Sequence, residues 1–273
     1  MRFKNVYIEG LAYHLPKNIV SSDDLEKRLA PVYDRLKLPF GRLEMMTGIK
    51  ERRFWDKGVC PSQVASKAGE LAILNSGIDR VEIGCLINAS VCRDFLEPAT
   101  ASLVHYNLGL RINTLVFDIS NACLGVLNGM VHVANMIELG QIRAGLVVAG
   151  ENGGPLVDAT IKSLLNKPEL TRNEIKSSFA SLTIASAAVG VLLVHKGLSK
   201  HKHRLLGGYS QAASQFNKLC RGNDESKTGV TNWSPLMKTD AETMMREGCR
   251  LAGQTWDCAK EILGWGNNDV NRV

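Results

Sequence analysis

The sequence predicts an α/β protein in which a mostly parallel sheet is covered by helices on both faces. Short apolar stretches alternate along the chain with longer segments whose apolar residues recur at helical spacing. Strands that are apolar along their whole length are typical of parallel sheets, because both of their faces are buried. The 273 residues, of which 45% are hydrophobic and 22% are charged, are enough for two joined cores in a compact protein.

The predicted strands are short runs of apolar and β-forming residues. Residues 6–13 alternate imperfectly between apolar and polar side chains and end before Pro16, so they form the first strand. Further strands are expected at residues 83–91, 114–119 and 144–149. The apolar run at residues 182–194 is expected to be one more strand, or a tight pair of strands, that completes this half of the fold.

Helices are predicted between these strands from their caps and from the spacing of their apolar residues. Ser22-Asp23-Asp24 is expected to cap a helix that runs to about Leu29. Pro61-Ser62 opens a second helix, which Gly77 stops. Residues 98–108 and 124–139 are also predicted as helices.

The order of elements starts again after a basic run at residues 195–204. Residues 204–209 are predicted as a strand and residues 240–263 as a long helix, as at the opening of the first half. We therefore expect a duplicated fold, with a first half at residues 1–198 and a second half at residues 199–273. Because the repeat stops so early, the second half is expected to be incomplete at its C-terminal end.

Neither a membrane span nor a signal peptide is predicted. The longest apolar stretches, residues 139–150 and 182–194, are shorter than the roughly 18–20 residues that a span requires. Polar residues interrupt the N-terminal stretch Met1-Arg2-Phe3-Lys4-Asn5, so a cytoplasmic location is expected. The seven cysteines are odd in number and form no Cys-x-x-Cys pair, which favours free thiols over disulfides or a zinc site.

The basic run at residues 195–204 leaves two interpretations open. It can be a solvated connection between the halves of the fold, which is how such runs usually behave. Alternatively, its Lys and Arg side chains can dock the phosphates of coenzyme A or an acidic carrier protein. Nucleic acid is not expected as a partner, because no aromatic residues are interleaved with the charges. His201 and His203 have metal-ligand spacing but no acidic or thiol neighbour in sequence, so no metal site is predicted.

The stretch from Val116 to Met130 is the most informative for chemistry. A buried strand ends near Ile119, a short turn follows, and Cys123 is expected in the first turn of a helix. Free backbone N–H groups and the positive end of the helix dipole favour a nucleophilic thiolate there. Gly125 and Gly129 remove side chains from one face of this helix, so another backbone can approach it closely.

The sequence around Cys123 also allows a structural role, but it does not indicate a protease. A free cysteine is most often a small buried hydrophobic residue, and placement alone does not exclude that role here. A papain-like protease is not indicated, because the local signature and a partner-histidine motif are missing. The sequence also lacks a Gly-x-Ser-x-Gly elbow, a Walker loop, His-Glu-x-x-His and Gly-x-Gly-x-x-Gly, and no bound cofactor or metal is expected.

The segment from Asp118 to Met130 resembles the nucleophile region of the β-ketoacyl synthase III branch of the thiolase superfamily. Thr47-Gly48-Ile49-Lys50-Glu51-Arg52-Arg53, Ile87-Asn88-Ala89-Ser90 and the span at residues 180–194 follow in the order that this family uses, so the similarity extends through nearly the whole chain. The resemblance implies a duplicated, layered α-β-α-β-α fold with mostly parallel sheets. It also implies that Cys123 carries an acyl group as a thioester.

Two further stretches, Arg93-Asp94-Phe95-Leu96-Glu97-Pro98-Ala99-Thr100-Ala101-Ser102 and Asn217-Lys218-Leu219-Cys220-Arg221-Gly222-Asn223, are most similar to the OleA-type enzymes. These join two fatty acyl-CoA molecules head to head, so acyl-CoA is the implied substrate and a homodimer the implied assembly. In that group the glutamate that matches Glu97 removes the α-proton and reaches the active site from the partner subunit. Without the resemblance, Glu97 would be interpreted as a solvated loop carboxylate.

Two competing hypotheses remain. One is a 3-oxoacyl-carrier-protein synthase III of fatty acid biosynthesis, which condenses an acyl primer with malonyl-carrier protein and releases carbon dioxide. Met46 argues against it, because many synthase III proteins have an arginine at this position beside the coenzyme site. The other is a catalytically inactive fragment that binds a partner, since the family's histidine and asparagine would follow Val273. Residues 184–190 also lack a glycine-rich turn that is common in the family.

Overall fold

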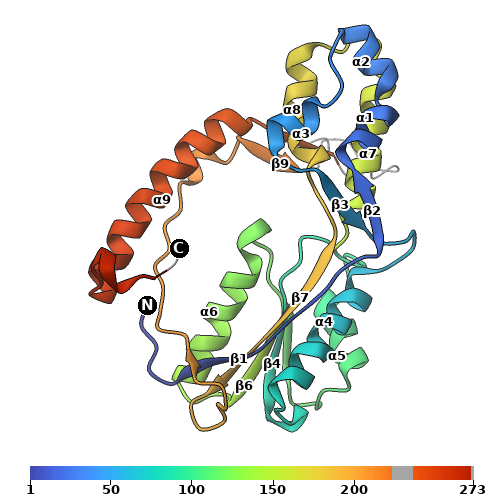
Figure 1. The fold of residues 1–273 in the computed structure, drawn as a ribbon. Coiled ribbons are helices and arrows are strands. Elements are labelled where there is room, and N and C mark those ends of the chain that lie inside the picture. Colours follow the sequence, from blue (N-terminus) through green and yellow to red (C-terminus); the bar gives the residue numbers. More distant parts are fainter. Residues whose placement is uncertain (223–235, 272–273) are drawn as a thin grey trace. The chain divides into compact units, whose positions relative to one another are not determined.

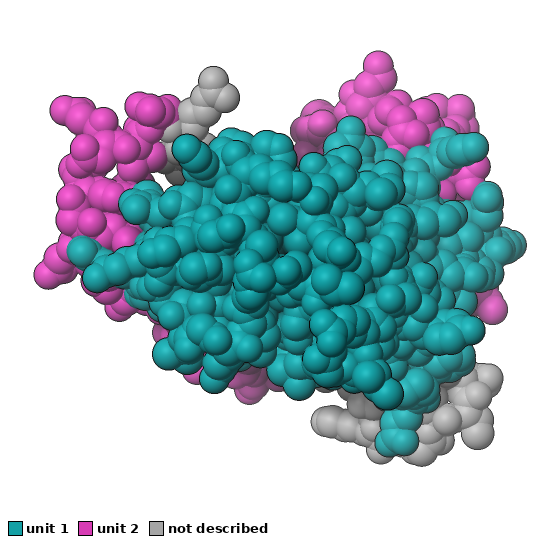
Figure 2. Space-filling view, turned by 90° about the horizontal axis from the view of Figure 1, so that it is seen from below, with its two compact units in different colours: residues 1–17, 55–152, 186–207 teal, residues 18–54, 153–185, 208–273 magenta. Residues whose placement is uncertain are grey.

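The computed structural model of the chain describes residues 1–222 and 236–271. Its contacts divide the chain into two compact units, each made of three separate segments (Figure 2). Unit 1 comprises Met1–Lys17, Trp55–Asn152 and Ser186–Gly207, and unit 2 comprises Asn18–Phe54, Gly153–Ala185 and Gly208–Val273. These compact units do not test the halves of a duplicated fold, so the division into residues 1–198 and 199–273 stays a prediction.

Unit 1 is built on a six-stranded sheet with the strand order β5-β4-β6-β7-β1-β8. Figure 1 labels four of its strands, β1, β4, β6 and β7. The strands are β1 (Val6–His14), β4 (Ile83–Asn88), β5 (Leu115–Asp118), β6 (Ala144–Glu151), β7 (Ala187–His195) and β8 (His203–Arg204). Strand β4 pairs in parallel with both β5 and β6, whereas β7 is antiparallel to both β6 and β1. Strands β1, β4, β5 and β6 therefore all point in one direction, and the predicted α/β class with a largely parallel sheet is confirmed.

Helices cover both faces of this sheet, as predicted (Figure 1). Helices α4 (Pro61–Ser76) and α5 (Thr100–Leu108) lie on one face, and α6 (Gly125–Glu138) lies on the other. Helix α4 packs closely because its sheet-facing residues are small, among them the fully buried Ala65, Ala68 and Ala72. A Cβ atom at Gly190 of β7 would lie 2.6 Å from the carbonyl oxygen of Ala68, so glycine is required at this close approach.

Unit 2 contains a second, separate core. Its helices are α1 (Ser22–Arg28), α2 (Ala30–Leu36), α3 (Arg42–Thr47), α7 (Gly154–Leu165), α8 (Arg172–Leu182) and α9 (Ala241–Leu263), and its strand pairs are β2 (Asn18–Ser21) with β3 (Glu51–Phe54) and β9 (Cys220–Gly222) with β10 (Met237–Thr239). Apolar side chains of α1, α2, α7 and α8 make up the core, including Leu25, Tyr33, Ile161 and Leu182. The 3-10 helices of the chain are η1 (Arg80–Glu82), η2 (Ala122–Leu124), η3 (Ser214–Phe216) and η4 (Asn267–Asp269).

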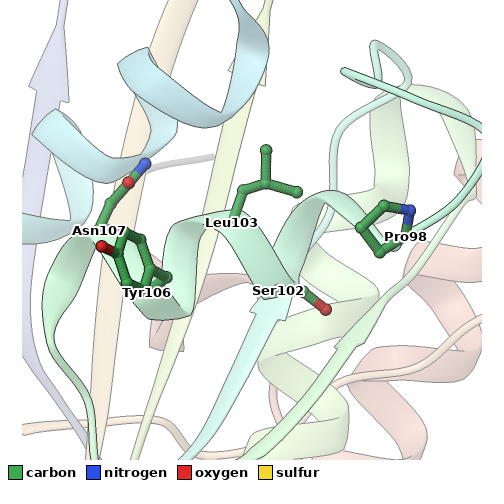
Figure 3. A pocket seen from close by; sticks show the side chains of 5 residues that line it. All are labelled: Pro98, Ser102, Leu103, Tyr106 and Asn107. Atoms are coloured by element: carbon green, nitrogen blue, oxygen red, sulfur yellow. The ribbon is translucent and has the colours of Figure 1, made fainter.

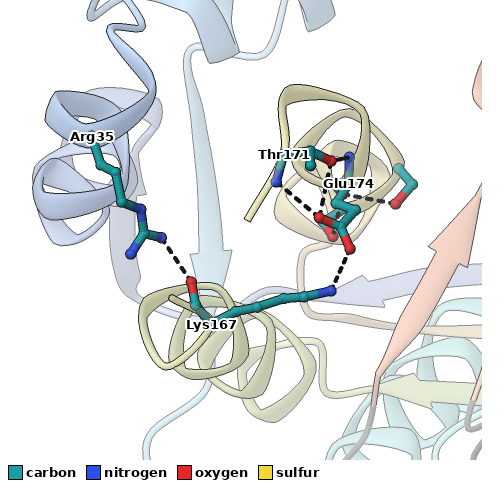
Figure 4. A network of polar contacts seen from close by, with 6 residues as sticks. Arg35, Lys167, Thr171 and Glu174 are labelled. Atoms are coloured by element: carbon teal, nitrogen blue, oxygen red, sulfur yellow. Dashed lines mark hydrogen bonds and ion pairs between the residues drawn. The ribbon is translucent and has the colours of Figure 1, made fainter. Parts of the chain in front are cut away.

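A network of polar contacts holds the start of α8 in unit 2 (Figure 4). Thr171 caps the helix, because its hydroxyl accepts the backbone N–H of Glu174 while the Glu174 carboxylate accepts the backbone N–H of Thr171. Lys167 pairs with the same carboxylate, and Arg35 of α2 donates to the Lys167 carbonyl at 2.9 Å. These contacts lower the pKa of Glu174 to about 2, with the hydrogen bond from Lys167 as the largest cause.

Two predicted strands differ from the structure. The run at residues 182–194 was expected to be a strand or a strand pair, but Leu182 ends α8 and the strand starts only at Ala187. The capping box at Thr171 starts a helix whose apolar face, with Phe179 and Leu182, packs in the core of unit 2. The strand expected at residues 204–209 is limited to His203–Arg204, which pairs with β1 at the edge of the first sheet.

The remaining predicted elements are present with small shifts at their ends. The helix expected from Ser22 begins at Ser22 with Ser21 as its cap, and the helix expected from residue 98 begins at Thr100. The long predicted helix at residues 240–263 is α9. Among the described residues, no helix is both long enough and apolar enough to cross a membrane.

Candidate active site

Cys123 lies on the chain that leaves the sheet after β5. The backbone N–H of Ile119 donates to the Asn88 carbonyl at 2.8 Å, which holds this exit against the end of β4. Cys123 is exposed and is the middle residue of η2, directly before α6. Cys123 thus lies in the first helical turn, as predicted, but this turn is a 3-10 helix. The 3-10 helix spans Ala122–Leu124, with Asn121 before it, and the α-helix begins at Gly125.

The backbone of Ala122 is strained immediately before the cysteine. Its φ of 44° lies in the left-handed region, where the Cβ atom of an L-residue costs about 1–2 kcal/mol. Side chains with branched Cβ atoms would be more costly at such a position. Strained backbone of this kind is often found where a reactive side chain must be held in one position. The arrangement thus presents the Cys123 side chain at a defined and accessible position.

Gly125 allows α6 to approach the end of β4 closely. A Cβ atom there would lie 2.4 Å from the carbonyl oxygen of Ala89, which is backbone and cannot move like a side chain. At Gly129 an added Cβ atom would lie 2.7 Å from a methyl carbon of Val147 in β6. The expected close backbone approach is therefore confirmed at Gly125, whereas Gly129 makes room for a side chain. Both glycines set the distance between α6 and the sheet.

Glu97 lies in the loop at residues 89–99 that connects β4 to α5. Its side chain is exposed, as are the neighbouring Phe95 and Leu96, with Leu96 retaining 90% of its accessible surface. Strands β4 and β5 are parallel neighbours, with Asn88 opposite Asp118. Glu97 and Cys123 thus follow the carboxyl ends of adjacent strands, at the same edge of the sheet in unit 1. This is the edge at which open α/β sheets usually bind their ligands.

Carboxylates that the sequence interpretation did not single out hold the loop at residues 89–99. Asp118, at the end of β5, accepts the backbone N–H groups of Thr100 and Ala101. Asp94 accepts both the backbone N–H and the hydroxyl of Ser62. Glu151, at the end of β6, accepts the backbone N–H groups of Val91 and Cys92. Two of these carboxylates could have been found from the sequence, because Asp118 and Glu151 are each an acidic residue at the end of an apolar strand.

The seven cysteines are all free thiols. Burial raises the pKa of Cys85 to about 12. Burial also raises the pKa of Cys92 to about 12, and the nearby Glu151 carboxylate adds to this shift. Both thiols are therefore protonated and unreactive near neutral pH. Cys123, Cys220 and Cys249 are exposed.

The basic run at residues 195–204 connects β7 to β8. Glu9, at an irregular position in β1, has a fully buried side chain that accepts the Ser199 hydroxyl and the backbone N–H of Lys200, each at 2.8 Å. The same carboxylate lies 3.0 Å from Nδ1 of His201. The His201 and His203 rings are stacked, but in the described part of the chain no three His, Cys, Asp or Glu side chains are grouped to hold a metal ion.

An open hollow of about 300 Å³ lies along α5 (Figure 3). Its lining consists of Pro98, Ser102, Leu103, Tyr106 and Asn107, which follow Glu97 along the chain. Neither Glu97 nor Cys123 lines it. Two positions at which the sequence departs from the family pattern can also be located. Met46 lies exposed in α3 of unit 2. Of residues 184–190, which lack the glycine-rich turn, residues 187–190 form the start of β7. Asn223, the last residue of one OleA-like stretch, lies outside the described residues.

Comparison with known proteins identifies the family. A family model described as 3-oxoacyl-[acyl-carrier-protein] synthase III matches residues 117–166, the segment that contains Cys123. An acyl-CoA:acyl-CoA alkyltransferase from Shewanella oneidensis is 42% identical over all of this chain and 78% of its own length. An acyl-CoA:acyl-CoA alkyltransferase from Xanthomonas campestris is 37% identical over all of this chain and 77% of its own length. A β-ketoacyl-[acyl-carrier-protein] synthase III from Koribacter versatilis is 34% identical over only 56% of the chain.

Solved structures agree with these relatives. Crystal structures of Xanthomonas campestris OleA match all of this chain and 76% of theirs, with a TM-score of 0.91 and 36% sequence identity. They include proteins in which a glutamate, a cysteine or a histidine is replaced, and a cysteine variant with bound lauric acid and lauroyl-CoA. Since the chain is 42% identical to the Shewanella protein and covers 78% of it, the chain belongs to the OleA-type acyl-CoA:acyl-CoA alkyltransferases, a family of acyltransferases.

Proposed function

We propose that this protein condenses two fatty acyl-CoA molecules and that Cys123 is the nucleophile that carries the first acyl group. The exposed position of Cys123, on a strained turn between β5 and α6, is the observation that carries this proposal. Leu124, the N-cap residue of α6, makes no side-chain cap to the first N–H groups of this helix, which begins two residues after Cys123. These groups, together with the positive end of the helix dipole, favour negative charge near Cys123.

The proposed reaction has two steps. In the first, the Cys123 sulfur attacks the thioester carbonyl of an acyl-CoA, a new thioester forms on the protein, and coenzyme A leaves as a thiol. In the second, a base removes a proton from the α-carbon of another acyl-CoA. The resulting carbanion attacks the acyl-Cys123 carbonyl, which releases the cysteine and leaves a β-ketoacyl-CoA. No carbon dioxide is formed in either step.

We assign the base in the second step to Glu97. Glu97 and Cys123 follow adjacent parallel strands, and the glutamate and cysteine replaced in the solved OleA structures have the same separation in sequence as Glu97 and Cys123. The Glu97 side chain is exposed, which fits a base that reaches beyond its own subunit and acts in a partner subunit. A carboxylate enclosed by such a partner would become a stronger base than one in water.

A homodimer is part of this proposal. Strand β5 is an edge strand, and exposed edge strands readily pair with another chain. Large apolar side chains are exposed around it: Ile112 in the preceding turn, Leu115 in β5, Leu124 in η2 and Leu127 in α6. Burying them between two copies would be favourable and would bring a partner close to the Cys123 segment. We further propose a cytoplasmic enzyme of lipid metabolism, with acyl-CoA as its carrier substrate and no bound cofactor.

The experiment that tests the reaction supplies the purified protein with a single long-chain acyl-CoA and follows the β-keto product by mass spectrometry. We expect product from the unaltered protein and none from Cys123→Ala. The family model matched at residues 117–166 favours one alternative, decarboxylating condensation with malonyl-carrier protein. Release of carbon dioxide from malonyl-carrier protein, without condensation of two acyl-CoAs, would establish that alternative. A folded protein that catalyses neither reaction would support the inactive, partner-binding role.

A further inference from the structure

Asp118 connects the two segments that carry the proposed catalytic residues. It is the last residue of β5, five positions before Cys123. One carboxylate oxygen accepts the side-chain N–H of Asn88 at 3.3 Å and the backbone N–H of Ala101 at 2.8 Å. The other oxygen accepts the backbone N–H of Thr100 at 3.0 Å. The carboxylate therefore holds the first turn of α5, just after the loop with Glu97, against the strand that leads to Cys123.

The remaining anchors of this loop leave only its tip free. Glu151 holds the start of the loop through Val91 and Cys92, at 2.7 and 3.2 Å. In the middle, Asp94 accepts the backbone N–H of Ser62 at 2.8 Å and its hydroxyl at 2.5 Å. The backbone N–H of Asp94 also donates to the Thr100 hydroxyl at 3.4 Å. Beyond Asp94, four exposed residues at positions 95–98 form the tip, with Glu97 among them.

We propose that Asp118 is a positioning residue for the condensation step, which it serves by fixing the place of Glu97 relative to the sheet. This inference rests on the proposed function, because it takes Glu97 as the base. A carboxylate is well suited to this role, since it accepts two N–H groups of a helix start and its charge is favoured by the helix dipole. An amide at position 118 would turn its N–H₂ group toward one of these donors and would carry no charge.

The expected consequence is selective for the second step. Cys123 is carried by η2 and α6, so its acylation depends little on the later part of the loop, residues 91–99. Proton removal by Glu97 requires that loop, and a displacement of about 1 Å can lower a rate by about 100-fold. Asp118→Asn should therefore reduce condensation by about 10- to 100-fold and leave acylation of Cys123 within about threefold of the unaltered protein. The stalled acyl-enzyme should be hydrolysed instead of condensed.

The test compares Asp118→Asn, Glu97→Gln, the double variant and a matched control. Asp79→Asn is the control, because Asp79 also accepts a backbone N–H, that of Val81. Asp79 precedes β4 and so lies at the amino end of that strand, away from Glu97 and Cys123. Acylation is measured as coenzyme A released in the first turnover, and condensation as β-keto product from radiolabelled acyl-CoA. If Asp118 acts through Glu97, adding Asp118→Asn to Glu97→Gln should lower the residual condensation by no more than about twofold.

Each outcome separates the two claims. Normal condensation by Glu97→Gln would show that Glu97 is not the base, which refutes that part of the proposed function. An impaired Glu97→Gln beside an Asp118→Asn variant that condenses normally would overturn only the role of Asp118. Equal losses of acylation and condensation in Asp118→Asn would also overturn it, since they indicate a general defect. If Asp118→Asn does not fold, Asp94→Asn carries the test, because it loosens the same loop without touching β5.

Discussion

The seven cysteines differ in their surroundings, and this difference makes Cys123 testable at the scale of a residue. Cys85 and Cys92 have pKa values raised to about 12 by burial, so almost none of either thiol is ionised at pH 8. Cys220 and Cys249 are exposed, like Cys123, but Cys220 lies in β9 and Cys249 lies within α9. They are therefore internal controls that separate reactivity from simple access to solvent.

We expect a brief exposure to a long-chain acyl-CoA or to iodoacetamide at pH 8 to modify Cys123 faster than the other cysteines. The physical reason is the strained turn and the uncapped start of α6, which present the sulfur and favour its charged form. Peptide mass spectrometry locates the adduct. Modification of Cys220 and Cys249 with Cys123 left untouched in a folded sample would return Cys123 to a purely structural role.

At the scale of elements, the position of Cys123 depends on how closely α6 approaches β4. Gly125 has no room for a Cβ atom, because the Ala89 carbonyl oxygen would be 2.4 Å away. At Gly253 in the middle of α9, an added Cβ would have no described atom within 4 Å apart from the neighbouring backbone of its own helix. The same substitution at these two glycines should therefore have opposite effects.

Gly125→Ala should lower the free energy of unfolding by about 1–3 kcal/mol, since α6 must move away from the sheet. Acylation of Cys123 should slow by about 10-fold or more, because the movement displaces the nucleophile. Gly253→Ala should instead stabilise the protein by up to about 1 kcal/mol, as alanine is the better helix former. Urea titrations and first-turnover release of coenzyme A measure both effects. A Gly125→Ala variant with unchanged stability would show that the close approach is not required.

The start of α8 provides a pH-dependent element. The pKa of Glu174 is lowered to about 2, so this carboxylate stabilises the folded form above its ordinary pKa near 4.5. That contribution is lost as the pH falls from about 4.5 to 2, when the carboxylate becomes protonated. Glu174→Gln keeps an oxygen for the Thr171 capping box but loses the pairing with Lys167.

We expect the amides of α8 to exchange with solvent faster in Glu174→Gln than in the unaltered protein at pH 7. The difference should shrink as the pH falls from about 4.5 and be small near pH 2, where about half of the Glu174 carboxylates are protonated. Hydrogen–deuterium exchange of peptides from residues 171–182, compared at matched intrinsic exchange, gives the measurement. An exchange difference that stays constant from pH 7 to pH 2 would mean that the charge of Glu174 does not stabilise α8.

At the scale of the whole molecule, assembly depends on the apolar side chains around β5. Leu115 retains 50% of its accessible surface in the edge strand, and Leu74 in α4 retains 63%. We expect the unaltered protein to sediment at twice the mass of one chain. Leu115→Lys should shift it toward single chains, because a charge would be buried at the proposed interface. Leu74→Lys, the matched control, should leave the mass unchanged.

Loss of the dimer should also reduce condensation more than acylation, if Glu97 acts in the partner subunit. Analytical ultracentrifugation and the two half-reaction assays can be run on the same samples. A Leu115→Lys protein that remains dimeric would move the interface elsewhere. A single-chain Leu115→Lys protein that condenses at the normal rate would mean that Glu97 does not need a partner.

Sequence patterns located most of unit 1 because its elements bury nearly continuous apolar stretches. Strands β4, β5 and β6 and helices α4, α5 and α6 were predicted within a few residues at their ends. Helices α2, α3, α7 and α8 were not predicted, and the run predicted as a strand began at Leu182, the last residue of α8. Much of unit 2 packs one face of each short helix into a core drawn from distant segments, such as Tyr33 with Leu164 and Leu182. Short windows of sequence contain little of that information.

The sequence alone determined the α/β class, the family resemblance and the two residues to test, Cys123 and Glu97, because these depend on local patterns and short motifs. Only the tertiary structure decided that both residues follow adjacent parallel strands, since pairing across the sheet joins segments far apart in sequence. It also decided that Cys123 sits in a 3-10 turn behind a strained alanine. The carboxylate contacts of Asp118, Asp94 and Glu151 likewise exist only once the chain is folded, because hydrogen-bond partners are chosen by position in space and not by order along the chain.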